Sequence, residues 1–160
     1  MLLRAGSPYA RIGAMAHIPI NHPLRPFYRA LSGIAGLYLI VFGVVGFIVA
    51  AGDGHRVLGQ GANLLWSILS LVLGAIVVVA TVIGRNVNVK VDQFVGWGLV
   101  GIGTYELALN RTDANIFDFT VSTVIVTYIV ALVLILSSLY GKVGTAEAAR
   151  AEQAAAHYGA

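Results

Sequence analysis

The sequence contains no cysteine. This absence excludes a disulfide framework, a zinc–thiolate site, an iron–sulfur cluster and a thiol nucleophile. Charged residues are scarce: they make up 11% of the 160 residues, whereas a soluble domain carries about 25%. Hydrophobic residues make up 58%, which excludes a disordered chain. With only 10 Lys and Arg against 7 Asp and Glu, the chain lacks the basic excess typical of nucleic-acid binding, and we expect no nucleic-acid partner.

What the sequence has instead is long apolar runs. A helix needs about 20 apolar residues to cross a bilayer. Four stretches have this length and are predicted to span a membrane: 31–51, 64–84, 91–109 and 119–140. The third is the weakest, since it is rich in glycine, contains Glu106 and begins at the polar edge formed by Asp92. Continuous runs of this length favour helices over the shorter, alternating strands of a barrel.

Short polar segments separate these runs, which predicts antiparallel neighbours. We therefore expect an all-α fold, an integral membrane four-helix up-down bundle over residues 31–140. Residues 1–30 are expected to form an N-terminal tail, and residues 141–160 a C-terminal tail with a short alanine-rich helix that begins after Thr145.

Lys and Arg near the ends of the spans predict the orientation. Eight of them fall in the two tails and the second loop: Arg4, Arg11, Arg25, Arg29, Arg85, Lys90, Lys142 and Arg150. Only Arg56 and Arg111 fall in the other two loops. This asymmetry predicts a multi-pass membrane protein with both termini in the cytoplasm.

Small residues recur at helical spacing in every predicted span. Because lipid gives apolar helices no hydrophobic reason to associate, small residues that permit close backbone approach indicate helix contacts. The predicted packing positions are Gly36, Gly43, Gly74, Gly98 and Gly101. Packing within the bundle is the first interpretation, and contact of one such seam with another protein or with lipid is the second.

Glu106 is the one acidic residue well inside an apolar run. An ionisable group in a membrane is a functional hypothesis by default. Glu106, however, lies only three residues from the outer end of its predicted span, so we expect an interfacial carboxylate that reaches water or pairs with Arg111. Contact with a partner or lipid, and proton or ion handling, remain as alternatives.

The proline-containing segment 17–29 (HIPINHPLRPFYR) is the most distinctive polar stretch, and Pro26 is well placed to begin the first helix. Arg25, Tyr28 and Arg29 are predicted to contact anionic lipid headgroups or a partner protein. Arg85, after the second span, is predicted to be an anchor of the same kind.

No arrangement of residues supports catalysis. The four histidines all lie outside the spans, and no pair has the spacing of a metal site. No nucleophile elbow is present. We therefore expect no catalytic residue, no cofactor and no metal, and we expect that the protein is not an enzyme.

Several segments together resemble one family. NHPLRPFYR, then VLGAIVVVATVIGRN, then RTDANIFDF and LILSSLYGK resemble a family of small actinobacterial membrane proteins known as a domain of unknown function. The resemblance covers about residues 17–142. It implies four membrane helices in an actinobacterial plasma membrane and brings no catalytic residues. Residues 1–14 precede the usual start of that family near Met15, which is an alternative start.

The absence of a chemical site, together with small-residue seams and polar tails, predicts a non-catalytic protein. We expect an accessory or scaffold subunit, or a lipid-contacting stabiliser, of a larger membrane complex. Its partners would be membrane lipids and other membrane subunits, or further copies of itself. The alternative is a small oligomeric transporter or channel with Glu106 near its outer mouth.

Overall fold

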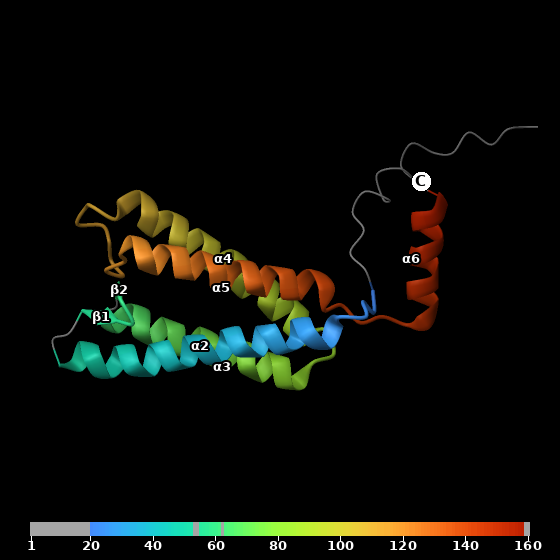
Figure 1. Ribbon diagram of the computed structural model, residues 1–160, viewed down its shortest axis with the longest axis horizontal. Coiled ribbons are helices and arrows are strands. Elements are labelled where there is room, and N and C mark those ends of the chain that lie inside the picture. The colour runs from blue at the N-terminus through green and yellow to red at the C-terminus, as the bar shows by residue number, and fades with distance from the viewer. Residues whose placement is uncertain (1–19, 53–54, 62, 159–160) are drawn as a thin grey trace, which may run out of the picture.

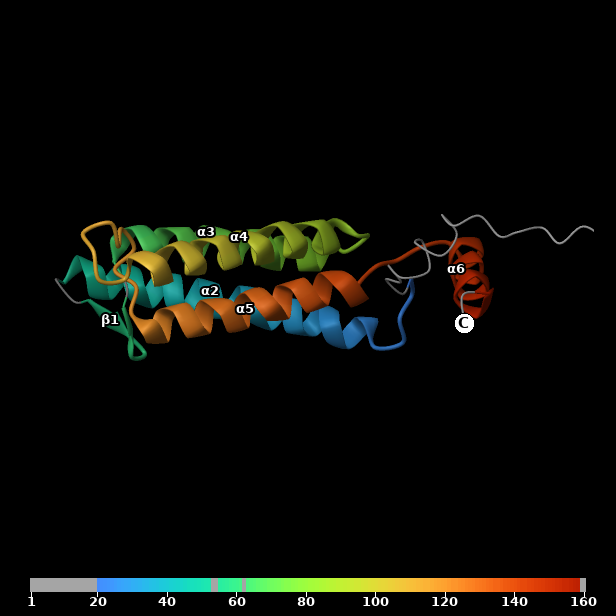
Figure 2. The same ribbon diagram turned by 90° about the horizontal axis from the view of Figure 1, so that it is seen from above.

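The computed structural model describes residues 20–52, 55–61 and 63–158. The expectations for residues 1–14 and for Met15 lie outside this range. The described chain is mostly helical, in agreement with the all-α prediction. Four long helices lie side by side, and a fifth, α6, stands apart at one end (Figures 1 and 2).

The order of elements is simple. The elements are α2 (Arg25–Ala51), β1 (Arg56–Val57), β2 (Gln60–Gly61), α3 (Leu64–Ile83), α4 (Val87–Leu109), α5 (Val121–Tyr140) and α6 (Ala146–Tyr158). Consecutive long helices run in opposite directions (Figure 1). We call the end at which α2 begins and α5 stops the terminal end, and the opposite end, which carries β1 and β2, the hairpin end.

Three of these helices, α2, α3 and α5, are long and apolar enough to cross a membrane. The helix α4 has the required length but also carries Lys90, Asp92 and Glu106. Two helices begin before the apolar runs that predicted them. The helix α2 starts at Arg25 because Pro26 fits its first turn, and α4 starts at Val87, after Asn86.

The close contact between α2 and α3 depends on glycine. A Cβ atom built on Gly43 would lie 2.6 Å from the Leu71 backbone nitrogen, and one built on Gly74 would lie 2.6 Å from the Gly36 carbonyl oxygen. A Cβ built on Gly36 would lie 3.2 Å from the Gly74 carbonyl oxygen. These three glycines therefore occupy the packing positions that the sequence assigns to them.

The contact between α4 and α5 uses Gly96 and Gly103, which lie in the same glycine-rich span as Gly98 and Gly101. A Cβ on Gly96 would lie 3.1 Å from the Ala131 carbonyl oxygen, and one on Gly103 would lie 3.3 Å from the Tyr128 ring. Gly98 and Gly101 are exposed, with open space where a Cβ would stand. The prediction is corrected here: residues 98 and 101 differ from 96 and 103 by two positions, which moves them to the far side of a helix.

The segment between α2 and α3 forms a small β-hairpin where a plain loop was expected. Arg56 pairs with Gly61 and Val57 with Gln60, and the two residues between them, Leu58 and Gly59, have φ values of 52° and 77°. A two-residue hairpin loop with two positive φ values normally contains Asn, Asp or Gly at the first position. Leu58 is 76% exposed, so packing does not explain its conformation.

Replacing Leu58 with asparagine is expected to raise the free energy of unfolding by about 1 kcal/mol, because asparagine tolerates a left-handed conformation that strains leucine. Thermal unfolding of the purified protein would measure the change. Leu58→Ala is the matched control, since alanine removes the exposed side chain but keeps the strain. Equal unfolding midpoints for Leu58→Asn and Leu58→Ala would show that relief of backbone strain does not cause the change in stability.

Candidate functional site

The terminal end joins segments that are far apart in sequence. The Asn21 backbone N–H donates to the Lys142 carbonyl at 3.0 Å, and the Asn21 side-chain amide donates to the Gly144 carbonyl at 3.0 Å. The Gly144 N–H in turn donates to Asn21 Oδ1 at 3.2 Å. The segment before α2 is thereby fixed to the segment that follows α5.

A second asparagine holds the same C-terminal segment. Asn86 Nδ2 donates to the Val143 carbonyl at 2.7 Å, and the Val143 N–H donates to Asn86 Oδ1 at 2.7 Å. Asn86 has a φ of 65°, a conformation that asparagine tolerates better than most residues. Asn21, Asn86 and residues 142–144 form what we call the terminal junction. It ties together the segment before α2, the α3–α4 connection and the segment after α5.

Aromatic rings pack beside the terminal junction. Tyr28 stacks on Tyr140 with ring centroids 4.9 Å apart and an interplanar angle of 18°. His22 lies edge-on, 5.3 Å from Tyr140. The structure therefore places Tyr28 within the chain's own packing, where the sequence predicts a lipid or partner contact.

Arg29 also turns toward the protein. Its Nε donates to the Thr81 carbonyl at 2.9 Å and its Nη2 to the Val82 carbonyl at 3.1 Å. These carbonyls belong to the last turn of α3, where intrahelical donors are missing and a cation is favourable. Arg29 thus caps α3, whereas Arg25 is half-buried and Arg85 is exposed.

A polar cluster that was not predicted lies deeper at this end. Asp92 is fully buried, and its Oδ1 accepts a 2.8 Å hydrogen bond from Ser32 Oγ. Ser32 Oγ is also 3.0 Å from Thr81 Oγ1. Side chains from α2, α3 and α4 meet there, although Asp92 was expected to be a polar edge of its span.

Glu106 lies at the hairpin end of α4 and is also fully buried. Its Oε1 accepts a 3.4 Å hydrogen bond from the Phe117 N–H, and its Oε2 has no partner within the part of the chain that the structure describes. Arg111 is exposed, and among the described residues the one ion pair joins His55 to Asp118. The expected pairing with Arg111 is therefore absent.

The α4–α5 loop explains the burial of Glu106. Asn110 and Asn115 both donate to the Phe119 carbonyl, at 2.6 and 3.0 Å, and the Phe119 N–H donates back to Asn115 Oδ1 at 2.8 Å. These bonds fold the loop back over the end of α4. Sequence distance from the end of the helix predicts access to water, but the folded loop removes it.

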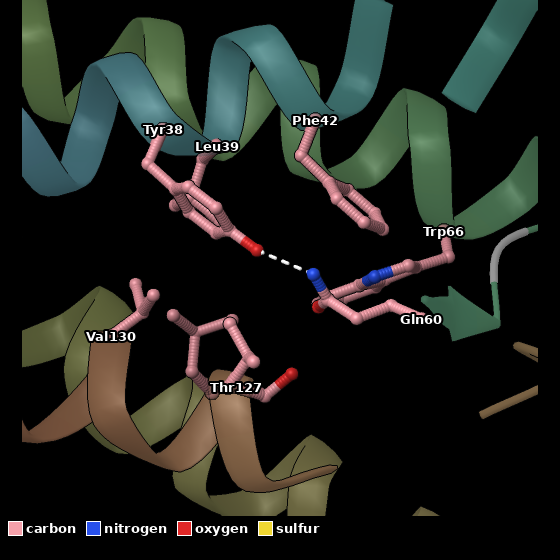
Figure 3. A pocket seen from close by; sticks show the side chains of 9 residues that line it. Tyr38, Leu39, Phe42, Gln60, Trp66, Thr127 and Val130 are labelled. Atoms are coloured by element: carbon pink, nitrogen blue, oxygen red, sulfur yellow. Dashed lines mark hydrogen bonds between the residues drawn. The ribbon is translucent and has the colours of Figure 1, made fainter. Parts of the chain in front are cut away.

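The hairpin inserts a polar side chain between helices. Gln60 is 7% exposed, and its Nε2 donates to the Tyr38 hydroxyl at 2.8 Å (Figure 3). Figure 3 shows Trp66, Phe42 and Thr127 around the same space. The cavity they line measures about 10 Å³, close to the space that one water molecule requires. It is too small for an organic substrate.

Comparison with known proteins adds no assignment. No protein-family model, curated protein or solved structure matches this chain. Among the described residues, no three His, Asp or Glu side chains gather as metal ligands would. The described residues contain two buried carboxylates, Asp92 and Glu106, and the hydrogen-bonded terminal junction.

A heptad pattern could have identified the buried carboxylates. Asp92, Val95, Leu99 and Glu106 are all buried and recur at intervals of three, four and seven residues along α4. The face that carries the apolar core therefore also carries both acids. Ser32 and Thr81 fall among the small residues of their helices, so their polar role has no separate signal in the sequence.

Proposed function

We propose that this chain is a non-catalytic integral membrane protein that crosses the bilayer four times. The burial of Asp92 and Glu106 supports counting α4 as a span, because both acids are hidden from the surface that lipid would contact. Its 23 residues correspond to about 34 Å, enough for the hydrocarbon core. Lys90 lies near the terminal end of α4, where its long side chain can reach the interface.

The distribution of cations supports the proposed orientation. Arg25, Arg29, Arg85, Lys90 and Lys142 lie at the terminal end, while Arg56 and Arg111 lie at the hairpin end. By the positive-inside rule, the terminal end faces the cytoplasm. Location in the plasma membrane, and membership of the actinobacterial family that the sequence resembles, belong to the same proposal.

We infer that the chain acts as an accessory or scaffold subunit of a larger membrane complex. The observation that carries this role is the outward face of α4. Gly98 and Gly101 have open space around them, and Phe94 and Trp97 beside them are 82% and 59% exposed. Exposed glycines flanked by aromatic rings permit close approach of a further helix, and the chain's own packing does not use them.

This role predicts co-purification that depends on α4. A C-terminally tagged chain extracted from its native membrane in mild detergent should retain other membrane subunits in stoichiometric amounts, as measured by mass spectrometry and native size. The variant carrying Gly98→Leu and Gly101→Leu should lose them at least tenfold, because leucine blocks close helix approach. Ala75→Leu on the exposed face of α3 is the matched control. Equal retention by all three proteins would contradict the proposal.

The alternative role, an oligomeric transporter or channel, predicts a different result. The chain would then purify as a homo-oligomer, and Glu106→Gln would abolish ion flux into liposomes without changing assembly. Between Asp92 and Glu106 the core contains the fully buried apolar residues Leu99, Ala131 and Leu134, so a polar path through one copy is closed in this structure. This closure favours the subunit role.

A further inference from the structure

Asp92 is buried where its ionised carboxylate would need a counter-charge. It is 0% exposed, its Oδ1 accepts one hydrogen bond from a neutral hydroxyl, that of Ser32, and its Oδ2 has no hydrogen-bond partner in the described part of the chain. An ionised carboxylate in such surroundings is strongly unfavourable unless a positive charge accompanies it.

No cation in the part of the chain that the structure describes supplies that charge. Arg29, the basic residue one helical turn from Ser32, directs its guanidinium to the carbonyls of Thr81 and Val82. Lys90 on α4, Arg85 on the connection and Lys142 after α5 are exposed, and α3 and α5 contain no acidic or basic residue. The described residues include no ion pair to Asp92 within 4.0 Å.

A fourth helix contributes an oxygen at the same level. On the α4–α5 contact, Gly96 faces Ala131 and Ile135, and Asn88 faces Gly141. This antiparallel register brings Ser137 level with Asp92. Ser137 is 1% exposed, and its Oγ, like Asp92 Oδ2, lacks a hydrogen-bond partner among the described residues. Two buried oxygens without hydrogen-bond partners, one on α4 and one on α5, thus occur at one level of the bundle.

We propose that Asp92, Ser32, Thr81 and Ser137 form a binding site for one small monovalent cation, either a proton or Na⁺. Both ligands are recognised by the same chemistry. A single carboxylate matches a single positive charge, and hydroxyl and carboxylate oxygens are the donors that hard cations prefer. Ser32 Oγ lies 2.8 Å from Asp92 Oδ1 and 3.0 Å from Thr81 Oγ1, so three of these oxygens are already close together.

Binding would also couple the helices. Ser32 and Thr81 belong to the tightly packed pair α2–α3, whereas Asp92 and Ser137 belong to the pair α4–α5. A cation shared between them neutralises the charge at the point where the two pairs meet, and its loss leaves an uncompensated carboxylate there. The bound state is therefore expected to be the more stable one. This inference is independent of the subunit role proposed above.

The test is thermal unfolding of the full chain in lipid nanodiscs, in two series. In the first, NaCl replaces choline chloride at constant ionic strength and constant pH; in the second, the pH is lowered in choline chloride alone. If Na⁺ is the ligand, the midpoint rises by about 4 °C at ten times the dissociation constant. If the proton is the ligand, the midpoint rises as the pH falls, and an infrared band of a neutral carboxylic acid is present.

Asp92→Asn is expected to abolish a Na⁺ dependence. If the proton is the ligand, it should remove the part of the pH dependence and of the infrared band that Asp92 contributes, while Glu106, the second buried carboxylate, keeps its own contribution. Asp113→Asn, which removes an exposed carboxylate in the α4–α5 loop, is the control and should retain it. Ser32→Ala keeps the charge and gives a readout even if Asp92→Asn fails to fold. It should weaken the apparent Na⁺ affinity several-fold, because an oxygen ligand is lost. If the proton is the ligand, it should instead strengthen proton binding, because the hydroxyl that donates to the ionised carboxylate is lost. A midpoint indifferent to both Na⁺ and pH, or a dependence that survives unchanged in the Asp92 and Ser32 variants, would overturn the proposal.

Discussion

Replacing Gly43 with alanine is expected to lower the free energy of unfolding by about 3 kcal/mol. The added Cβ would stand 2.6 Å from the Leu71 backbone nitrogen and 2.7 Å from the Ser67 carbonyl oxygen. The backbone atoms of a helix cannot move one at a time. The helices α2 and α3 would therefore have to separate along their contact. Equilibrium unfolding of the purified chain in detergent would measure the loss.

Gly98→Ala provides the matched comparison for this effect. The same methyl group at residue 98 meets open space, and alanine favours a helix over glycine by about 1 kcal/mol. The stability of the isolated chain should therefore stay the same or rise slightly. A similar loss for the two variants would mean that the cost arises from the helix backbone itself and not from the α2–α3 contact.

Replacing Asn86 with alanine is expected to cost about 3 kcal/mol and to release residues 142–144 from the terminal junction. The change removes both 2.7 Å hydrogen bonds to Val143 and puts alanine at a φ of 65°, at a cost of about 1 kcal/mol for each bond and for the strain. Hydrogen exchange at the Val143 amide should become at least a hundred-fold faster.

Asn86→Gly separates the two causes, because glycine adopts positive φ without strain but makes no side-chain bond. It should speed exchange at Val143 while recovering about 1 kcal/mol of stability relative to alanine. If Val143 exchanged at the wild-type rate in both variants, the Asn86 amide would not be the group that holds the C-terminal segment.

Length and hydropathy were sufficient to predict the long helices, because burial in lipid or in a helix core requires the same apolar runs. Length and hydropathy did not predict where two of these helices start. The helices that start at Arg25 and Val87 begin several residues before their apolar runs. Pro26 permits a helix start among polar residues, and Asn86 supplies the turn before α4. Hydropathy identifies only the apolar part of a helix and does not show how far the helix continues beyond it.

The residues of the site were harder to predict than the helices. A carboxylate near the end of a span usually meets water, so the sequence predicts a polar edge at Asp92. In the structure Asp92 is instead buried and hydrogen-bonded to Ser32, 60 residues away in sequence. Tyr28 and Arg29 were expected to contact lipid headgroups or a partner protein, but they contact Tyr140 and Thr81, which are 112 and 52 residues away in sequence. Such contacts depend on how neighbouring helices are aligned with each other. The spacing of residues within one helix does not determine that alignment.

The terminal junction has a consequence for the synthesis of the chain. Asn21 and its partner Gly144 are 123 residues apart, so the ribosome has completed every long helix before the second of them emerges. Until then Asn21 and Asn86 lack the backbone groups that they bind in the finished protein. A chain that ended before residue 142 would display these unsatisfied amides. Residues 142–144, which are made after all four long helices, therefore fix in place Asn21, which is made before them.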